Sequence, residues 1–180
     1  MTVDEHTLYI LVFMAQDGNS SSEILPDGGQ RGKHAVCPIS VVENNYNIIN
    51  RKHESLIPFL EENGIGWEAH GPLFKGLLTG AFQAGATFAA DDWRSYSVNY
   101  ANLQKYAPLL QYLAELGQEK GATSVQLSLA WILNRKPYIV PIPGMKKLER
   151  LEENMAAADI VLTAYEVKRV DELVNNTRCE

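Results

Sequence analysis

The chain has 180 residues, of which 46% are hydrophobic and 21% charged, a composition typical of an ordinary globular domain rather than a disordered or fibrous chain. With 16 Lys and Arg against 22 Asp and Glu, the net charge is −6, which argues against binding to nucleic acid or to an anionic membrane surface. The two cysteines, Cys37 and Cys179, form no disulfide framework, so a reducing, cytoplasmic location is expected. The four histidines show no metal-ligand spacing, and no metal site is expected.

Residues 1–34 are predicted to form an irregular N-terminal segment with one strand. The strand is expected over residues 8–15, an apolar run much shorter than the ~20 residues that a membrane-spanning helix needs. No positively charged segment precedes this run, so a secretory signal peptide is not expected. The residues after it are rich in Gly, Ser, Asp and Pro, which predict turns and loop.

Residues 35–180 form a second unit in which strands and helices alternate. Short β-branched or alternating runs predict strands over 39–42, 65–69 and 138–142. Apolar periodicity predicts helices over 53–62, 103–116 and 147–158, and capping-box pairs predict two more that begin after Thr123 and Thr163. The Gly-rich segment 71–99 indicates a lid, a binding loop or disorder. This alternation predicts a parallel sheet, either doubly wound or part of a (β/α) barrel.

A cluster of cations follows the last predicted strand. The chain turns at Pro143 and Gly144, and the next helix carries Lys146, Lys147 and Arg150 in its first turns. The free N–H groups and the dipole of a helix N-terminus favour an anion, so this cluster could bind a phosphate. Alternatively, the cations form a solvated face and pair with neighbouring glutamates at helical spacing.

Two more segments lie at the ends of predicted strands. The segment 69–80 contains His70 and three glycines, and α/β folds bind their ligands at this end of a strand. A lone histidine in this position is also a common structural residue. The segment 43–46 (Glu-Asn-Asn-Tyr) could hold a polar ligand through hydrogen bonds or could form an Asn-rich turn. No catalytic triad, Walker loop or GxGxxG motif after a strand is present, which excludes those classes.

Taken in order, these segments resemble the C-terminal half of an aldo-keto reductase, from about residue 38 to residue 174. Residues 38–51 resemble the region of that family's sixth barrel strand, and residues 65–73 resemble the seventh strand and its turn. Residues 140–144 and 151–154 resemble the eighth strand and the helix after it. The resemblance implies an α/β fold that is part of a (β/α)8 TIM-type barrel and lacks the first strands. It also implies NADPH as the cofactor, and aldehydes or ketones as substrates.

The resemblance gives roles to individual residues. Glu43 stands where the family usually has a Gln that hydrogen-bonds the nicotinamide carboxamide, and ionised Glu can only accept such bonds. His70 stands where an aromatic residue stacks on the nicotinamide ring. The turn around the pyrophosphate corresponds to Gly71 (usually Ser), Pro72, Leu73 and Gly76, with Phe74 replacing a usual Gly. The 2′-phosphate pocket, which favours NADPH over NADH, corresponds to Gly144, Met145, Lys146, Lys147 and Arg150, and the adenine site to Glu153 and Asn154.

The first half of such a barrel is not recognisable in residues 1–34. The resemblance places the family's catalytic Asp, Tyr, Lys and His in that half, and a whole barrel needs about 250 residues. Hydride transfer to a carbonyl needs an acid for the alkoxide. His70 and Tyr46 are weak candidates for it, so no catalytic residue is assigned. The sequence therefore leaves three interpretations: a truncated NADPH-dependent reductase, a non-catalytic NADP-binding partial barrel, or a half-barrel that associates with itself through open sheet edges.

Overall fold

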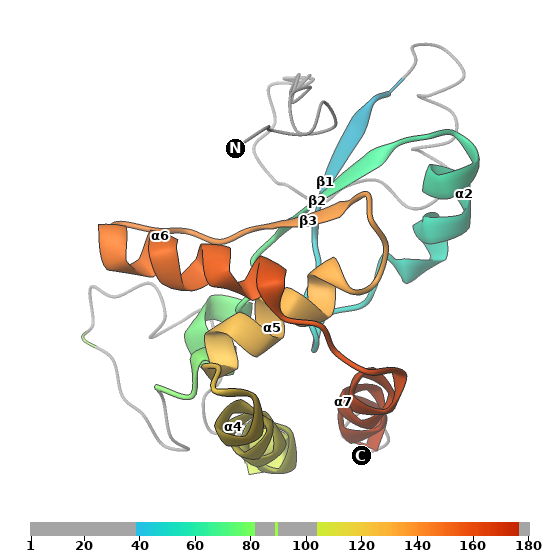
Figure 1. The fold of residues 1–180 in the computed structure, drawn as a ribbon. Coiled ribbons are helices and arrows are strands. Elements are labelled where there is room, and N and C mark those ends of the chain that lie inside the picture. The colour runs from blue at the N-terminus through green and yellow to red at the C-terminus, as the bar shows by residue number, and fades with distance from the viewer. Residues whose placement is uncertain (1–38, 82–88, 90–103, 177–180) are drawn as a thin grey trace.

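A three-stranded parallel sheet organises the computed structural model, which describes residues 39–81, 89 and 104–176 (Figure 1). The strands β1 (Val41–Asn45), β2 (Gly66–His70) and β3 (Ile139–Ile142) lie side by side in chain order. The predicted N-terminal segment, its strand over 8–15 and most of the loop 71–99 lie outside the described residues.

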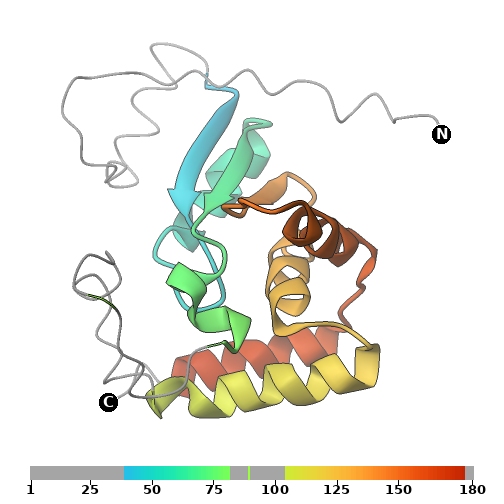
Figure 2. The same cartoon turned by 90° about the vertical axis from the view of Figure 1, so that its left-hand side faces the viewer.

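Helices connect the strands and complete the chain. Between β1 and β2 come η2 (Glu54–Leu56) and α2 (Ile57–Glu62). Between β2 and β3 come η3 (Phe74–Thr79), α4 (Ala107–Lys120) and α5 (Ser124–Leu133), and after β3 follow α6 (Leu148–Met155), η5 (Ala156–Asp159) and α7 (Ala164–Asn176). The turned view shows α4 and α7 side by side along one end of the molecule (Figure 2).

Both predicted capping boxes are present. The backbone N–H of Gln126 donates to Thr123 Oγ1 (3.2 Å), and the N–H of Thr123 donates to the Gln126 side chain (2.9 Å). At α7 the N–H of Thr163 donates to the Glu166 carboxylate (2.7 Å), and the N–H of Glu166 donates to Thr163 Oγ1 (3.3 Å). The spacing in the sequence was therefore sufficient to predict where α5 and α7 begin.

The first strand and the first long helix lie later in the chain than predicted. β1 runs over 41–45 rather than 39–42, because Asn44 and Asn45 pair with Ala69 and His70 despite the low strand propensity of Asn. α4 begins at Ala107, after a 3-10 turn that starts at residue 104, and continues to Gly121, whose φ of +64° ends the helix in the left-handed conformation.

The order and direction of the strands indicate barrel winding. Right-handed crossovers between neighbouring parallel strands taken in sequence order place every connecting helix on the same face of the sheet. Accordingly, Val42, Trp67 and Ile139, which are register partners, are all buried beneath the helices. A doubly wound sheet would carry helices on both faces.

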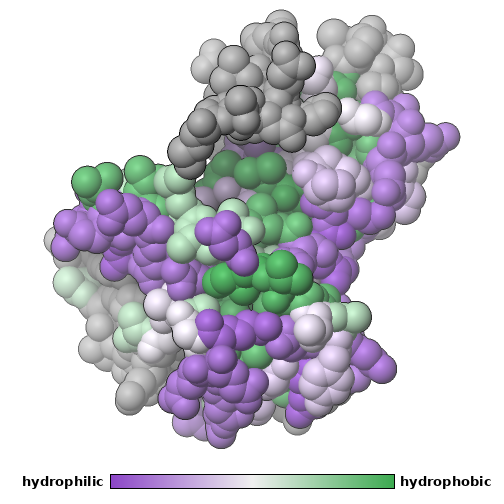
Figure 3. Space-filling view, viewed as in Figure 1, coloured by the Kyte–Doolittle hydropathy of each residue, from purple (hydrophilic) through white to green (hydrophobic). Residues whose placement is uncertain are grey.

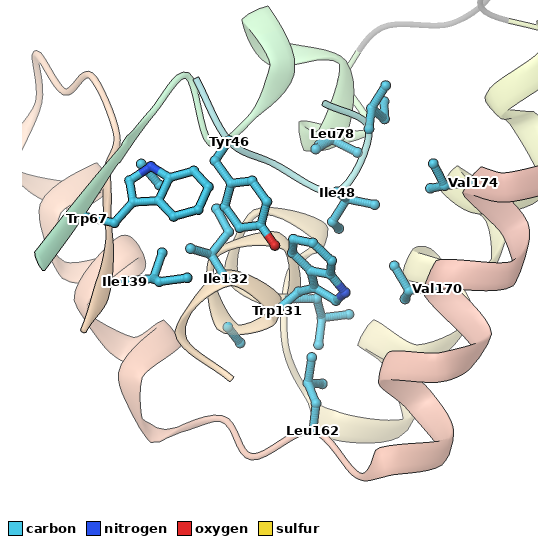
Figure 4. Close-up of a cluster of buried hydrophobic side chains, with 14 of the residues drawn as sticks. Tyr46, Ile48, Trp67, Leu78, Trp131, Ile132, Ile139, Leu162, Val170 and Val174 are labelled. Carbon is cyan, nitrogen blue, oxygen red and sulfur yellow. The ribbon is translucent and has the colours of Figure 1, made fainter. Parts of the chain in front are cut away.

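Aromatic rings form the centre of the core between the sheet and α5. The ring of Tyr46 lies 4.7 Å from that of Trp67 and 5.6 Å from that of Trp131, measured between centroids (Figure 4). All three side chains are at most 1% exposed. The guanidinium groups of Arg51 and Arg135 lie 4.7 and 4.9 Å from the ring centroid of Trp131. Polar groups thus close one side of this aromatic core.

No helix in the described part of the chain is long and apolar enough to cross a membrane. Within the same ranges, His, Cys, Asp and Glu side chains form no group of three or more that could hold a metal ion.

Candidate functional site

The predicted site residues lie on the three strands or in the segments that follow their carboxyl ends. On the face of the sheet that carries none of the described helices, two rows of register partners cross the strands: Glu43, Glu68 and Val140, then Asn45, His70 and Ile142. Glu43 is exposed and His70 is half-buried. His70 therefore lies one row nearer the carboxyl edge than Glu43, where parallel α/β sheets bind their ligands.

Asparagine side chains from β1 and from the segment after it support the turn that follows β2. Gly71 has a φ of +62°, and a Cβ atom at this position would meet Asn45 Nδ2 at 2.6 Å. Its carbonyl accepts a hydrogen bond from Asn47 Nδ2 (2.9 Å). Asn45 Oδ1 in turn accepts from Asn50 Nδ2 (2.8 Å). Glu43, Asn44 and Asn45 thus belong to β1 rather than to the Asn-rich turn expected over residues 43–46, and the turn comes after the strand. The asparagines of β1 and of this later turn fix the backbone on which His70 and Gly71 lie.

Two non-glycine residues of the same turn have the left-handed backbone conformation. Phe74 has a φ of 45° and Lys75 a φ of 57°, followed by Gly76 at 93°. A residue with a Cβ atom strains the backbone there, by roughly 1–2 kcal/mol in each case. Pro72 is buried and Leu73 is half-buried, and the carbonyl of Leu73 accepts the N–H groups of Gly76 (3.0 Å) and Leu78 (3.2 Å). The backbone of this turn is thus held in a defined, strained shape.

The connection from β3 to α6 presents the predicted cation cluster. Lys146, Lys147 and Arg150 are exposed, and none of them forms an ion pair with another described residue. A Cβ atom at Gly144 would have no atom within 4 Å, so the backbone there is open to approach. Lys147 precedes α6 in an extended conformation, and no side chain caps this helix. These features favour the anion-binding interpretation over a face of paired charges.

The two residues assigned to adenine lie where α6 contacts α5. Glu153 and Asn154 are half-buried. The Glu153 carboxylate accepts a hydrogen bond from Thr123 Oγ1 (2.9 Å), and the Glu153 carbonyl accepts one from Gln126 Nε2 (3.1 Å). One carboxylate oxygen of Glu153 thus accepts a hydrogen bond from the residue that precedes α5, and the other oxygen is left to accept one from a ligand.

The structure separates Tyr46 from the site. Its ring lies in the core on the helix-covered side of the sheet, and its hydroxyl donates to Glu54 Oε1 (2.7 Å). Burial, reinforced by the hydrogen bond to this carboxylate, raises the pKa of Tyr46 well above its ordinary value. Tyr46 is therefore not available as a proton donor at the open face.

Sequence reasoning missed Glu68. It is the register partner of Glu43 and lies on the same face of the sheet, half-buried. The signal was present in the sequence, because Glu68 alternates with Trp67 and Ala69, which are both buried, and must point to the opposite side. Two carboxylates therefore stand next to one another behind His70.

The sequence matches the profile of the Aldo/keto reductase family over residues 21–175. The chain belongs to this family. Aldo-keto reductase str7 of Strobilurus tenacellus is 35% identical over 153 residues, which cover 82% of this chain and 46% of that protein. Aldo-keto reductase yakc of Schizosaccharomyces pombe, whose name specifies NADP(+), is 33% identical over 148 residues, 79% of this chain and 44% of the relative. The chain thus spans less than half the length of these curated relatives.

Solved structures show the same relationship. The thermostable aldo-keto reductase Tm1743, solved with the inhibitor epalrestat, superposes with a TM-score of 0.56 at 29% identity, over 76% of this chain and 40% of the other. The glycerol dehydrogenase AKR11B4 from Gluconobacter oxydans superposes with a TM-score of 0.75 at 24% identity, over 83% and 46%. These neighbours are barrels, so the predicted partial (β/α)8 barrel is confirmed and the doubly wound alternative is excluded. The family match begins at residue 21, earlier than the predicted start at about residue 38.

Proposed function

We propose that this aldo/keto reductase chain is an NADPH-dependent oxidoreductase that reduces aldehydes and ketones to alcohols. The observation that carries the proposal is the β3–α6 connection, where three cations without ion pairs among the described residues flank an open glycine. A dianionic 2′-phosphate needs charged partners and close backbone approach, and both are available there. The two fungal relatives are aldo-keto reductases, and the name of one specifies NADP(+).

Each part of the site then has a task toward the cofactor. Lys146, Lys147 and Arg150 hold the 2′-phosphate, with Gly144 and Met145 beside it, while Glu153 and Asn154 hold the adenine. The turn of Gly71, Pro72, Leu73 and Gly76 lies along the pyrophosphate. His70 stacks on the nicotinamide, and Glu43 accepts a hydrogen bond from its carboxamide N–H. When bound, NADPH supplies the hydride.

The proposal needs an acid for the alkoxide, and Tyr46 is buried away from the open face. We therefore place the acid in the first half of the barrel, as the family resemblance implies. We also propose that the substrate is a small carbonyl compound. The cytoplasmic location expected from Cys37 and Cys179 is likewise part of this proposal.

The test measures the binding of NADPH and NADH to the purified chain. Calorimetry and the fluorescence emission of the reduced nicotinamide monitor this binding. Arg150→Ala should weaken NADPH binding at least tenfold and leave NADH binding nearly unchanged, because only NADPH carries the 2′-phosphate. Arg169→Ala is the matched control, since Arg169 is also a surface arginine and lies on α7 rather than on α6. Equal losses for the two cofactors in Arg150→Ala would refute the phosphate assignment.

A second candidate is a partial barrel without turnover, either an NADP-binding module or a half-barrel that associates through its open edges. The observation that favours it is that β1 and β3 have no further strand partner among the residues described. Oxidation of NADPH with a generic aldehyde, when the first half of an aldo-keto reductase barrel is supplied together with this chain, supports the reductase. Saturable NADPH binding without oxidation supports the module.

A further inference from the structure

His70 ends β2 at the carboxyl edge of the sheet and is half-buried. Its register partners on the same face, Asn45 of β1 and Ile142 of β3, carry no charge. The imidazole forms no hydrogen bond or ion pair with another residue that the structure describes. His70 is therefore the one side chain in its row whose charge can change, and an imidazole ordinarily makes that change within about pH 5 to 8.

The charged groups around His70 lie on several elements. Glu68 precedes it by two residues on β2, Glu43 lies beside Glu68 on β1, and Lys75 lies in the turn that follows β2. The strand β3 contains no titratable side chain, and the cation cluster comes after it. Ile142 is 39% exposed, and hydrophobic side chains gather over β3 (Figure 3). This apolar surface beside His70 strengthens charge interactions there, because it screens charge less than water does.

We propose that His70 makes the cofactor site sensitive to pH and to the redox state of the cofactor together. The inference rests on the proposed function, in which His70 stacks on the nicotinamide. That ring carries a positive charge in NADP⁺ and is neutral in NADPH. Protonated His70 therefore repels NADP⁺ but not NADPH, whereas an uncharged aromatic ring in this position makes no such distinction. As the pH falls, the site increasingly prefers NADPH, and NADP⁺ dissociates more readily.

Thermodynamic linkage gives the same effect seen from the proton. If the proton on His70 weakens NADP⁺ binding, NADP⁺ binding must expel that proton into the buffer, whereas NADPH binding leaves it in place. At the effective dielectric constant of a protein surface, two unit charges at stacking distance repel strongly enough to change an affinity more than tenfold. Because His70 is only half-buried, we expect a change of roughly tenfold.

The experiment titrates the full chain with NADP⁺ and with NADPH by calorimetry between pH 8 and pH 5.5. The quantity of interest is the Kd for NADP⁺ divided by the Kd for NADPH, which should rise roughly tenfold as the pH falls. Both forms carry the same 2′-phosphate, so its own ionisation, at about pH 6, cancels in this ratio. The ratio therefore reports on the nicotinamide end of the site.

Three variants assign the effect to one residue. His70→Phe keeps a flat ring that takes up no proton, so its ratio should not change with pH, and His70→Tyr should behave in the same way. Any pH dependence that comes from the neighbouring carboxylates persists in both. His53→Phe makes the same change next to Glu54, whose carboxylate accepts from Tyr46 in the core, and it should keep the dependence of the wild type.

A second readout follows the proton itself. Calorimetry at pH 6 in buffers of different ionisation enthalpy should detect a proton released by NADP⁺ in excess of NADPH in the wild type, and no excess in His70→Phe. A constant ratio while both forms bind would overturn this inference alone, and so would a dependence that is unchanged in His70→Phe. Binding of neither form would refute the proposed function and this inference with it.

Discussion

At the scale of single residues, the shape of the proposed pyrophosphate turn depends on one asparagine. Asn45 lies directly beneath Gly71, and its Oδ1 is fixed by Asn50 and, at 3.3 Å, by Asn47. A flexible surface side chain would move aside for an added methyl group, but a side chain held by two donors resists such a movement. Space at Gly71 is therefore as restricted as its backbone conformation.

Comparing two glycines separates these effects. Gly64 has nearly the same φ as Gly71, +63°, but nothing lies within 4 Å of its would-be Cβ atom. Gly64→Ala should cost about 1 kcal/mol through backbone strain alone. Gly71→Ala should cost about 1–3 kcal/mol more, the usual range for overpacking, when both are measured by urea unfolding. Equal losses would show that Asn45 yields freely.

At the scale of elements, Glu166 at the start of α7 takes part in both the helix cap and an ion pair. Partial burial alone would raise the pKa of Glu166, but hydrogen bonds from Thr163 and the ammonium group of Lys120, 3.0 Å away, lower it below its ordinary value. A lowered carboxyl pKa stabilises the fold at neutral pH. The contribution is complete above the unfolded value of about 4.3 and disappears as the pH falls through the folded value.

Glu166→Gln should therefore destabilise the protein at pH 7 and have little effect at pH 3. The amide oxygen still accepts the N–H of Thr163, so the cap survives while the charge is lost. Urea unfolding at the two pH values measures the difference in free energy of unfolding between wild type and variant. Lys120→Met removes the partner of Glu166, so its destabilising effect should likewise be larger at pH 7 than at pH 3. A stability difference between wild type and Glu166→Gln that is the same at both pH values would contradict the role of the ionised carboxylate.

Local elements of this kind were predictable from the sequence, whereas the contacts between them were not. The pairs Thr123 with Gln126 and Thr163 with Glu166 act across three residues, and their spacing alone predicts the caps. By contrast, the bond from Asn47 to Gly71 spans 24 residues and depends on the register of two strands. Lys146, Lys147 and Arg150 were predictable as a cluster, but the absence of ion pairs between them and the glutamates of α6, among the described residues, appears only in the three-dimensional structure.

At the scale of the whole molecule, Asp171 connects distant parts of the chain. Its carboxylate contacts Arg51 (2.8 Å) from the region after β1, and Arg135 (3.1 Å) and the Trp131 indole N–H (3.2 Å) from the end of α5. The Arg51 side chain is 6% exposed, and burial lowers its pKa. Removing its main counter-charge would leave a buried cation with only the more weakly interacting carboxylate of Glu54 to compensate it.

Asp171→Asn should accordingly cost about 3 kcal/mol, the lower end of the range for breaking a buried ion pair, because Asp171 itself is 25% exposed. The neighbouring Glu172→Gln makes the same change of charge and should cost no more than about 0.5 kcal/mol, since its partners Lys168 and Arg169 are exposed. Chemical unfolding of both variants measures the difference. Similar values for the two would show that the network contributes little.

The contrast between α5 and α6 has a consequence for how the molecule opens. α5 buries most of its side chains, whereas α6 buries none. Local unfolding requires little free energy where few contacts are lost, so we expect the amide protons of α6 to exchange with solvent through small openings and those of α5 to exchange mainly through larger ones. A nucleotide bound at the start of α6 would therefore spend part of its binding free energy on ordering that helix. Its measured affinity would understate the strength of its contacts by that amount.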